Sequence, residues 1–348
     1  MFNDERYSRQ TILPGIGEQG QYLLNAAKVL VVGAGGLGCP VLQYLSAAGI
    51  GTIGIIDHDL VSLSNLQRQI LFTEADLGKS KSLTAKSKIH LLNSDIQIIA
   101  YDFALNPDNA LQLIEAFDIV IDGTDNFATR YLINDICVQL GKPFIAASIL
   151  QFEGQISVYN FQNGPTYRCI FPQPPQEALT CADAGVIGVL GGIMGTLQAN
   201  EAIKMITGIG EVLSGKLFII NALDLTNHTL SFERSDHWQM YNPADYAHLC
   251  VVEQVSEMAP SALKTVLSEV TILDVRNTQE YKKYNIGGLN ISPELIIAQL
   301  NYIPTDREIV VCCQRGNLSL AVAKQLQSTK KFKKVYSLKG GILAYSSL

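Results

Sequence analysis

Three short polar segments between residues 57 and 126 carry side chains that could act on a triphosphate. Arg68 lies in "LVSLSNLQRQ", Lys81 in "LGKSK" and Asp125 in "IDGTDN". Attack at an α-phosphate builds negative charge on the departing pyrophosphate, and Arg, Lys and a carboxylate-held Mg²⁺ neutralise such charge. One donor of this kind contributes about 3 to 4 kcal/mol at the transition state. The set therefore predicts a reaction that consumes a nucleoside triphosphate.

A glycine-rich turn precedes these segments and has the spacing of a nucleotide-binding loop. The stretch "VLVVGAGGLG" ends in the G-x-G-x-x-G pattern, with glycines at Gly33, Gly35, Gly36 and Gly38. These glycines allow a tight turn, close phosphate approach and close packing of the helix that follows. Asp57, at the end of the next strand, can accept hydrogen bonds from a ribose. The loop alone does not separate NAD from ATP, whereas the cations and carboxylate downstream favour ATP.

Each polar side chain also has an ordinary structural explanation. Arg68 and Lys81, taken singly, are typical of exposed charges. Asp125 is well placed to cap the helix that "TDNFATR" begins. The order of all three behind the glycine loop makes the phosphate-binding interpretation the stronger one.

The surrounding pattern predicts an α/β fold in two domains. Runs such as "KVLVVGAG" and "GTIGIID" alternate with helix-like segments such as "CPVLQYLSAAG", which predicts a parallel sheet covered by helices. Antiparallel pieces follow Gly154, so we expect a Rossmann-like mixed sheet within residues 1–242. A linker is expected over residues 243–257. A smaller α/β domain is expected over residues 258–348, where "VTILDVR" and "EIVVCCQRG" resume the alternation.

Composition excludes several classes of partner. The net charge of −6 argues against a basic face for nucleic acid or anionic lipid. The charged N-terminal stretch "MFNDERYSRQ" has no apolar segment of a secretion signal, so we expect a cytoplasmic protein without a membrane or nucleic-acid partner. The seven cysteines are irregularly spaced, which fits reduced thiols better than a disulfide framework.

The quoted segments, with "RYSRQ", "EGQISVY" and "LTCADAGV", resemble the MoeB/ThiF-type sulfur-carrier adenylyltransferases, bacterial relatives of ubiquitin-activating enzyme, over about residues 5–234. Members adenylate the C-terminal glycine of a ubiquitin-like sulfur carrier. The resemblance implies ribose binding by Asp57 and a Mg²⁺ site at Asp125. The expected ATP-binding residues are Gly33, Gly35, Gly36, Gly38, Asp57, Asn65, Arg68, Lys81, Asp125 and Asn126.

Two further residues take roles from this resemblance. Arg9, the second arginine of "RYSRQ", would reach into the nucleotide site of a partner subunit, which implies a homodimer. The alternative for Arg9 is a flexible terminal charge. Cys181 lies where family members carry a cysteine that takes up sulfur or the carrier's acyl group. A small buried residue is the alternative for Cys181.

One departure from the family concerns zinc. Members commonly bind structural zinc through two C-x-x-C pairs, whereas "PTYRC" retains Cys169 and has Thr166 at the first position. No second pair follows Phe232. Four thiolates cannot be assembled from one cysteine, so we expect no zinc site and another means of holding this loop.

Residues 258–348 resemble a rhodanese domain through "ILDVRNTQEYKKYNIGGLNIS", "VVCCQRGNLSLAVAKQL" and "VYSLKGGILAY". Cys313 opens a loop before a helix, where successive backbone N–H groups stabilise a thiolate or a persulfide. Leu318 stands where family loops often carry arginine, which leaves the sulfur donor and the activity of this domain open. Cys312 is expected in the core, because neighbouring strand residues point to opposite faces.

The resemblances together imply a two-step enzyme. ATP would adenylate a sulfur carrier ending in Gly-Gly, and a persulfide on Cys313 would then supply sulfur for a thiocarboxylate, with Cys181 as a relay. A cysteine desulfurase or thiosulfate would load Cys313. The first carrier candidate is the small subunit of molybdopterin synthase, and the thiamine-thiazole carrier is the second. An NAD-dependent dehydrogenase and a non-catalytic sulfur-sensing scaffold remain as alternatives of other classes.

Overall fold

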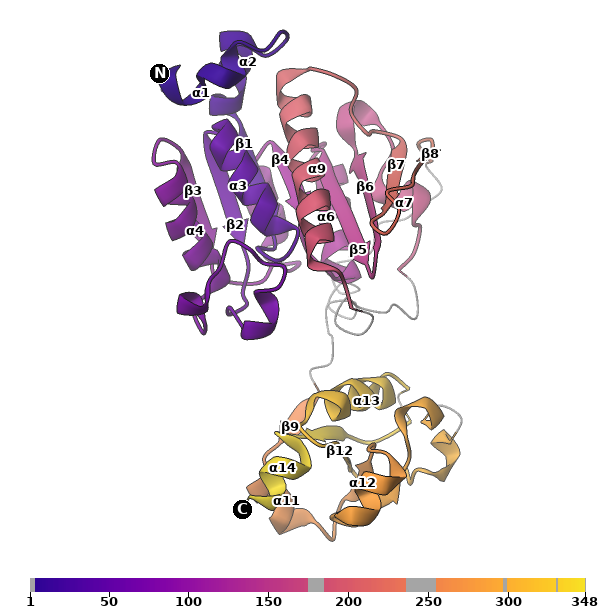
Figure 1. Cartoon of the computed structure of the whole chain (residues 1–348). Coiled ribbons are helices and arrows are strands. Elements are labelled where there is room, and N and C mark those ends of the chain that lie inside the picture. The colour runs from indigo at the N-terminus through magenta and orange to yellow at the C-terminus, as the bar shows by residue number, and fades with distance from the viewer. Residues whose placement is uncertain (1–3, 175–184, 236–254, 297–298, 330, 348) are drawn as a thin grey trace. The chain divides into compact units, whose positions relative to one another are not determined.

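The computed structural model describes residues 4–174, 185–235, 255–296, 299–329 and 331–347 (Figure 1). The chain divides into two compact units, Met1–Cys250 and Val251–Leu348. Among the described helices, none combines the length and the apolar character that a membrane crossing needs.

The first unit is built on an eight-stranded mixed sheet with the order β3-β2-β1-β4-β5-β6-β7-β8. The strands from β3 to β5 in this order pair in parallel, and β6, β7 and β8 continue the sheet antiparallel. The strands are β1 (Lys28–Val32), β2 (Thr52–Ile56), β3 (Gln97–Tyr101), β4 (Ile119–Asp122), β5 (Phe144–Leu150), β6 (Glu153–Tyr159), β7 (Lys216–Asn221) and β8 (Asn227–Ser231). The Rossmann-like mixed sheet expected from the sequence is confirmed.

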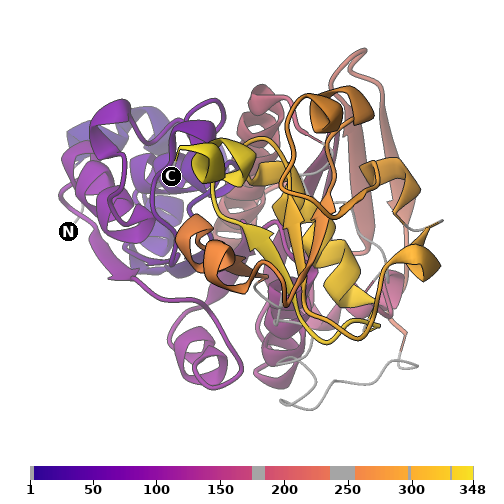
Figure 2. The same cartoon turned by 90° about the horizontal axis from the view of Figure 1, so that it is seen from below.

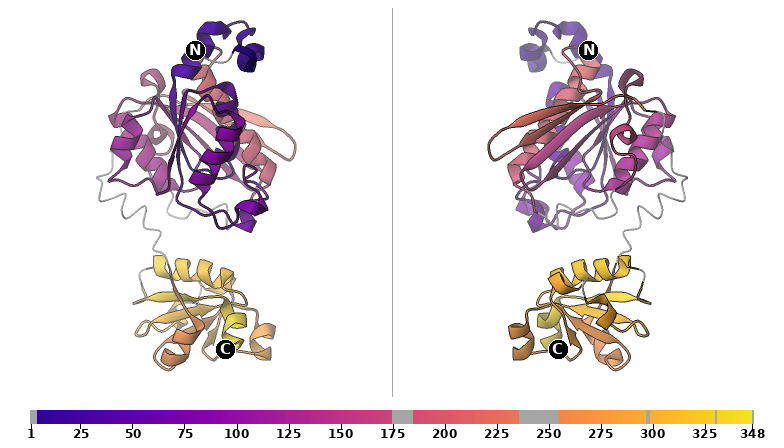
Figure 3. Two further views of the ribbon diagram at one scale, coloured as in Figure 1. Left: turned by 90° about the vertical axis from the view of Figure 1, so that its left-hand side faces the viewer. Right: turned by 90° about the vertical axis from the view of Figure 1, so that its right-hand side faces the viewer.

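Helices cover both faces of this sheet, which Figure 3 shows nearly edge-on. The buried residues of α3 (Gly38–Ala48), α4 (Lys81–Leu92) and α9 (Gly188–Thr207) pack on one face. Those of α5 (Ala110–Glu115), α6 (Phe127–Gln139) and α7 (Tyr167–Ile170) pack on the other. The helices α1 (Asp4–Thr11) and α2 (Gly17–Ala26) precede β1 and lie at the amino ends of the strands (Figure 1).

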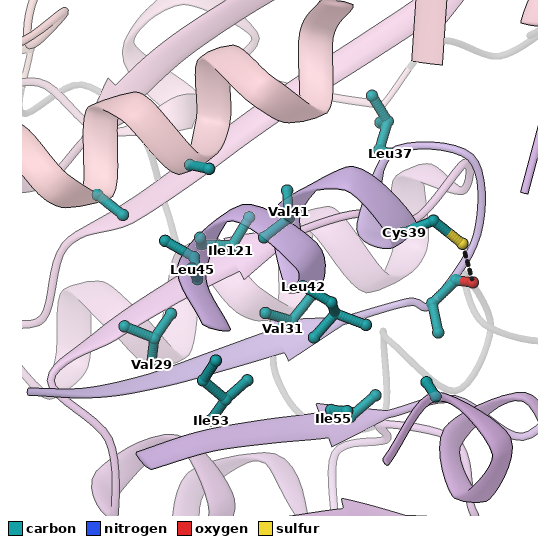
Figure 4. Packing of buried hydrophobic residues seen from close by; sticks show 14 of the residues in the cluster. Val29, Val31, Leu37, Cys39, Val41, Leu42, Leu45, Ile53, Ile55 and Ile121 are labelled. Atoms are coloured by element: carbon teal, nitrogen blue, oxygen red, sulfur yellow. Dashed lines mark hydrogen bonds between the residues drawn. The ribbon is translucent and has the colours of Figure 1, made fainter. Parts of the chain in front are cut away.

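Alternation along the strands explains this layering. Val29 and Val31 of β1 belong to the core under α3, whereas Leu30 and Val32 belong to the core under α6. Figure 4 shows Val29 and Val31 with Ile53, beneath side chains of α3. Because both faces are buried, the parallel strands are continuous apolar runs rather than alternating ones. Their carboxyl ends carry the glycine loop, Asp57 and Asp122.

The second unit has a five-stranded parallel sheet with the order β11-β10-β12-β13-β9, and helices lie on both sides of it (Figure 2). The strands are β9 (Ser256–Met258), β10 (Thr271–Asp274), β11 (Leu289–Asn290), β12 (Ile309–Cys312) and β13 (Val335–Leu338). The helices are α11 (Pro260–Val266), α12 (Thr278–Lys283), α13 (Asn317–Ser328) and α14 (Gly341–Ser346). The expected small α/β domain is confirmed.

The expected linker over residues 243–257 is too long at its carboxyl end. Val255 is only 5% exposed and packs in a core of the second unit. Ser256 and Glu257 form β9 and pair with Tyr336 and Ser337 of β13. Polar composition concealed this edge strand, because only one of its faces is covered. Residues 243–254 lie outside the described part of the chain.

Candidate active sites

The glycine loop joins β1 to α3 in a conformation that its glycines require. Gly33 has a φ of +93°, and a Cβ added to Gly38 would lie 1.9 Å from the carbonyl oxygen of Gly33. At Gly35 the same test finds no heavy atom closer than 3.7 Å, the Nε2 of Gln69. Gly38 therefore closes the turn against the helix, and Gly35 leaves its backbone open to the neighbouring cavity.

This difference predicts that alanine at Gly38 lowers stability, whereas alanine at Gly35 weakens ATP binding. Gly38→Ala should lower the free energy of unfolding by about 3 kcal/mol or more, because the methyl group collides with backbone. Gly35→Ala should change the free energy of unfolding by less than about 1 kcal/mol and raise the KM for ATP, because its methyl group occupies open space near the loop. Urea unfolding and ATP–pyrophosphate exchange measure the two effects. Equal destabilisation by both substitutions would contradict this division of roles.

A cavity of about 340 Å³ lies beside this loop, at the carboxyl ends of the parallel strands. Ligands bind at this edge in open α/β sheets. The expected site residues that line it are Gly33, Gly35, Gly36, Asp57, Arg68, Lys81, Asp125 and Asn126. Three expected residues, Arg9, Asn65 and Gly38, do not line it. Polar residues that we did not expect also line it, among them Asp59 and Arg130.

Asp57, Asp59 and Lys81 form a connected chain along one wall of the cavity. Asp57 accepts hydrogen bonds from the backbone N–H groups of Ala34 in the glycine loop and of Asp59, both at 2.8 Å. The ammonium group of Lys81 donates to Oδ2 of Asp59 at 2.8 Å, and the Lys81 side chain is only 6% exposed. Burial raises the pKa of Asp57, and the positive charge of Lys81 opposes that rise. Lys81 is therefore a buried, paired cation rather than an ordinary surface charge.

Arg68 and Asn65 share one turn but have different surroundings. The side chain of Asn65 accepts a hydrogen bond from the backbone N–H of Ser62 at 3.2 Å and closes the cap of the 3₁₀ turn Leu63–Asn65. The Asn65 carbonyl accepts the backbone N–H of Arg68 at 3.1 Å. The Arg68 side chain runs beside Gly36, where its Cγ lies 3.4 Å from an added Cβ. In this arrangement Asn65 shapes the turn that presents Arg68.

Asp125 and Asn126 are neighbours in the loop between β4 and α6 but have different surroundings. The side chain of Asn126 accepts the backbone N–H of Thr129 at 2.8 Å and is the cap of α6. Asp125 is consequently not needed as a cap, and it lies exposed at the cavity. Among the described residues, the side chains close enough to share a metal ion are Asp57, His58 and Asp59, and Asp125 is not in that group.

A buried ion pair that the sequence analysis missed supports this loop. Nε of Arg130 donates to Oδ2 of Asp122 at 2.5 Å, and the two side chains are 5% and 0% exposed. Nη2 of Arg130 also donates to the carbonyl oxygens of Thr124 and Ala147, at 3.2 and 2.8 Å. Arg130 thus ties the loop that carries Asp125 to strand β5. The signal in the sequence was an aspartate ending an apolar strand eight residues before an arginine.

Two residues expected from the resemblance lie away from this cavity or outside the described structure. Arg9 is exposed on α1. The neighbouring Gln10 donates to the carbonyl oxygen of Ala48, which precedes β2, so α1 contacts the amino edge of the sheet. The cavity lies at the opposite edge. Cys181 lies outside the described residues.

A sulfur-centred network holds the loop of Thr166 and Cys169, for which the sequence predicts no zinc site. Cys169 Sγ accepts the backbone N–H groups of Thr166 and Ser235, both at 3.3 Å. Arg234 donates to the carbonyl oxygens of Asn163 and Gly164, at 3.2 and 3.0 Å. These contacts join the chain after β8 to the turn before α7. They provide the alternative closure that the missing C-x-x-C pair required, and the absence of zinc stays a prediction.

In the second unit, Cys313 lies in a cradle of backbone N–H groups. Its sulfur accepts from Gly316 and Ser319, both at 3.2 Å, and the residue is 4% exposed. Cys312 belongs to the core on the opposite face of β12, and burial raises the pKa of its thiol, as expected for a structural cysteine. Of these two neighbouring thiols, Cys313 is the one that receives the backbone N–H groups of the loop.

The C-terminal helix α14 holds this loop from behind. The backbone N–H of Ile342 donates to the carbonyl oxygen of Cys313 at 2.8 Å, and that of Leu343 donates to the carbonyl oxygen of Gln314 at 3.1 Å. Gly341 packs so closely that an added Cβ would lie 2.3 Å from the Cys313 carbonyl oxygen. These contacts make the backbone around Cys313 depend on α14.

A second cavity of about 700 Å³ opens at Cys313. Arg315 and Leu318 line it, and Leu318 is 45% exposed. The guanidinium of Arg276 also lines it but is committed to Asp274, with Nη2 to Oδ2 at 2.6 Å. Among the residues that line this cavity, Arg315 is therefore the one exposed cation.

Comparisons with known proteins assign each unit to a family. Residues 7–240 match the ThiF family and residues 259–348 match the rhodanese-like domain. The chain is 39% identical to the probable adenylyltransferase/sulfurtransferase MoeZ of Mycobacterium tuberculosis, covering 98% of this chain and 92% of that protein. It is 45% identical to adenylyltransferase and sulfurtransferase MOCS3 of Xenopus laevis over 80% of this chain, and the matched part spans only 62% of that relative.

Solved structures resemble the first unit. The crystal structure of E. coli MccB with ATP superposes with a TM-score of 0.60 and 25% identity, over 68% of this chain and 75% of that one. MccB with MccA-N7isoASN gives a TM-score of 0.61 at the same identity. The extent of the family match, together with the fold and the glycine loop, shows that this chain belongs to the ThiF family and continues into a rhodanese-like domain.

Proposed function

We propose that the chain is an adenylyltransferase and sulfurtransferase that activates the C-terminal glycine of a ubiquitin-like sulfur carrier. The observation that carries this proposal is the convergence of Arg68, Lys81 and Asp125 on one cavity beside an open glycine loop. The relatives named adenylyltransferase and sulfurtransferase support it. A nicotinamide dehydrogenase would need a hydride pocket rather than two cations and a carboxylate.

In the first step, the carrier's terminal carboxylate attacks the α-phosphate of ATP, and pyrophosphate leaves. Lys81 and Arg68 stabilise the negative charge that builds on the leaving group. Asp125 is free of the helix-capping role, and one carboxylate together with phosphate oxygens is a common ligand set for Mg²⁺. Bound Mg²⁺ would neutralise charge on the phosphates. The product is an acyl adenylate, in which AMP is a good leaving group.

In the second step, the terminal sulfur of a Cys313 persulfide attacks the acyl carbon and AMP leaves. A second thiolate must then attack the Cys313 sulfur, which breaks the S–S bond, forms a new disulfide with Cys313 and releases the thiocarboxylate. Cys181 is the candidate for this thiolate. The backbone cradle around Cys313 stabilises the anionic sulfur in each state. A thiol reductant must then reduce this disulfide, and the freed Cys313 thiolate takes a sulfane sulfur from a cysteine desulfurase persulfide or from thiosulfate, which regenerates the persulfide.

The assembly proposed for this chemistry is a cytoplasmic homodimer. Arg9 lies at the sheet edge opposite its own cavity, so it would act on the nucleotide of a second copy. The small subunit of molybdopterin synthase is the first carrier to test and the thiamine-thiazole carrier is the second. We propose no zinc, because Thr166 stands at the first position of the C-x-x-C pair and Cys169 alone does not make a four-thiolate site.

Intact-mass measurement of the carrier tests both steps at once. Incubation with Mg-ATP and a candidate carrier should add one adenylyl group to the carrier. Further addition of thiosulfate, or of a cysteine desulfurase with cysteine, should replace one carboxylate oxygen by sulfur. Tight NADH binding in calorimetry with no ATP binding would refute the proposal. A scaffold without catalysis would bind the carrier and leave its mass unchanged.

A further inference from the structure

Helix α1 is fastened to the sheet by a buried polar contact on its inner face. Tyr7 is 3% exposed, and its hydroxyl oxygen accepts a hydrogen bond from Nδ2 of Asn93 at 2.8 Å. Asn93 is fully buried, and the same nitrogen donates to the carbonyl oxygen of Ser46 at 2.7 Å. The tyrosine is thereby joined to the ends of both α3 and α4.

The tyrosine ring also packs against Gly49, where a side chain would collide with it. A Cβ added to Gly49 would lie 2.6 Å from the ring, and Gly49 has a φ of +84°. One turn later, Nε2 of Gln10 donates to Oε1 of Gln21 at 2.5 Å and to the carbonyl oxygen of Ala48 at 3.1 Å. Gln21 is itself fully buried. Terminal segments are ordered only where contacts hold them, and α1 is held at both Tyr7 and Gln10.

These contacts give Arg9 a defined direction. Residues three apart lie on one side of a helix, so Tyr7 and Gln10 share the inner face of α1. Arg9 is placed away from that face and is exposed. Figure 1 shows α1 at the amino ends of the strands, whereas the nucleotide cavity lies at their carboxyl ends. The fastened helix therefore presents Arg9 to the solvent, away from the nucleotide cavity of its own chain.

We infer that Tyr7 and Asn93 are positioning residues that prepare Arg9 of one chain for the nucleotide cavity of a second copy. The inference rests on the proposed function, in which Arg9 acts across the dimer. A long cation on a loose terminus would have to be ordered in each encounter, whereas a fixed helix removes that cost in advance. The side chains that fasten the helix belong to one chain, and the reaction that they assist takes place in the other.

Mixed dimers test this direction of action. Arg9→Ala leaves the nucleotide cavity complete, and Lys81→Ala leaves Arg9 complete, so a mixture of the two variants should recover ATP–pyrophosphate exchange. Tyr7→Phe keeps the ring that packs on Gly49 and removes only the hydroxyl. Placed on the Lys81→Ala chain, it should lower the recovered rate at saturating ATP about tenfold, the factor equivalent to one lost hydrogen bond. Placed on the Arg9→Ala chain, it should leave the recovered rate unchanged.

Comparing Tyr7→Phe on the two chains distinguishes a positioning role of Tyr7 from a general effect on stability. An equal loss in both placements, or no loss in either, would overturn the inference. Tyr22→Phe is the matched control, because Tyr22 of α2 is 63% exposed, and it should have no effect in either chain. Failure of the mixture to recover exchange would overturn the intermolecular role of Arg9 and this inference together. Exchange by the unsubstituted chain in the same assay shows separately whether the proposed adenylation holds.

Discussion

Replacement of Lys81 by alanine is expected to reduce ATP–pyrophosphate exchange by about 100- to 1,000-fold, the usual effect of removing one donor to a developing charge. The Lys81 side chain is 6% exposed and its ammonium group is paired with Asp59, so a water molecule in its place would stabilise the developing charge poorly. Asp59 keeps a half-exposed side chain, 55% exposed, and can be solvated when its partner is lost, so the fold should survive. Exchange of radiolabelled pyrophosphate into ATP measures the effect.

Lys79 provides the matched control for this substitution. It lies two residues from Lys81, is 60% exposed and pairs with Asp76 at 3.7 Å. Lys79→Ala removes a charge of the same kind without touching the cavity, and exchange should be unchanged. Asp125→Ala should reduce exchange by a factor similar to that of Lys81→Ala. Normal exchange in both cavity variants would refute the assignment of this site.

Replacement of Cys313 by serine should leave ATP–pyrophosphate exchange intact and stop thiocarboxylate formation. Serine fits the same backbone cradle, and its oxygen cannot carry a transferable sulfane sulfur. The fold around Gly316 and Ser319 should therefore be preserved while the second step is lost. Intact mass of the carrier should show the adenylyl adduct and no exchange of oxygen for sulfur.

Cys312→Ala is the control for this experiment. The adjacent thiol is fully buried on the other face of β12, and burial raises its pKa, so it is a poor nucleophile. Cys312→Ala should retain thiocarboxylate formation at a modest cost in stability. Sulfur transfer that survives Cys313→Ser but not Cys312→Ala would reverse the assignment of the two cysteines.

Local patterns in the sequence were sufficient to predict the fold and the loop. The β-branched run before Gly33 and the glycine spacing after it depend on neighbours only a few residues away. The same reasoning placed Asp57 at a strand end and Cys313 at a helix start. Asn65 is ambiguous for a related reason, since asparagine serves equally as a ligand and as the cap of a short turn.

Contacts between distant segments could not be predicted from local pattern. Arg130 lies within an amphipathic helix, and only the fold brings it to Asp122 and to the carbonyl oxygen of Ala147. The Cys169 sulfur meets Ser235, 66 residues further along the chain, and nothing in "PTYRC" specifies that partner. The buried seat of Tyr7 likewise needs Asn93, 86 residues away.

The hydrogen bonds between α14 and the loop that begins at Cys313 have a consequence for protein engineering. The loop that begins at Cys313 owes its backbone shape to Ile342 and Leu343, which follow it by almost thirty positions. Transplanting this loop alone into another scaffold would leave the carbonyl groups of Cys313 and Gln314 without their donors. A chimera that is meant to carry persulfide chemistry must import the terminal helix along with the loop.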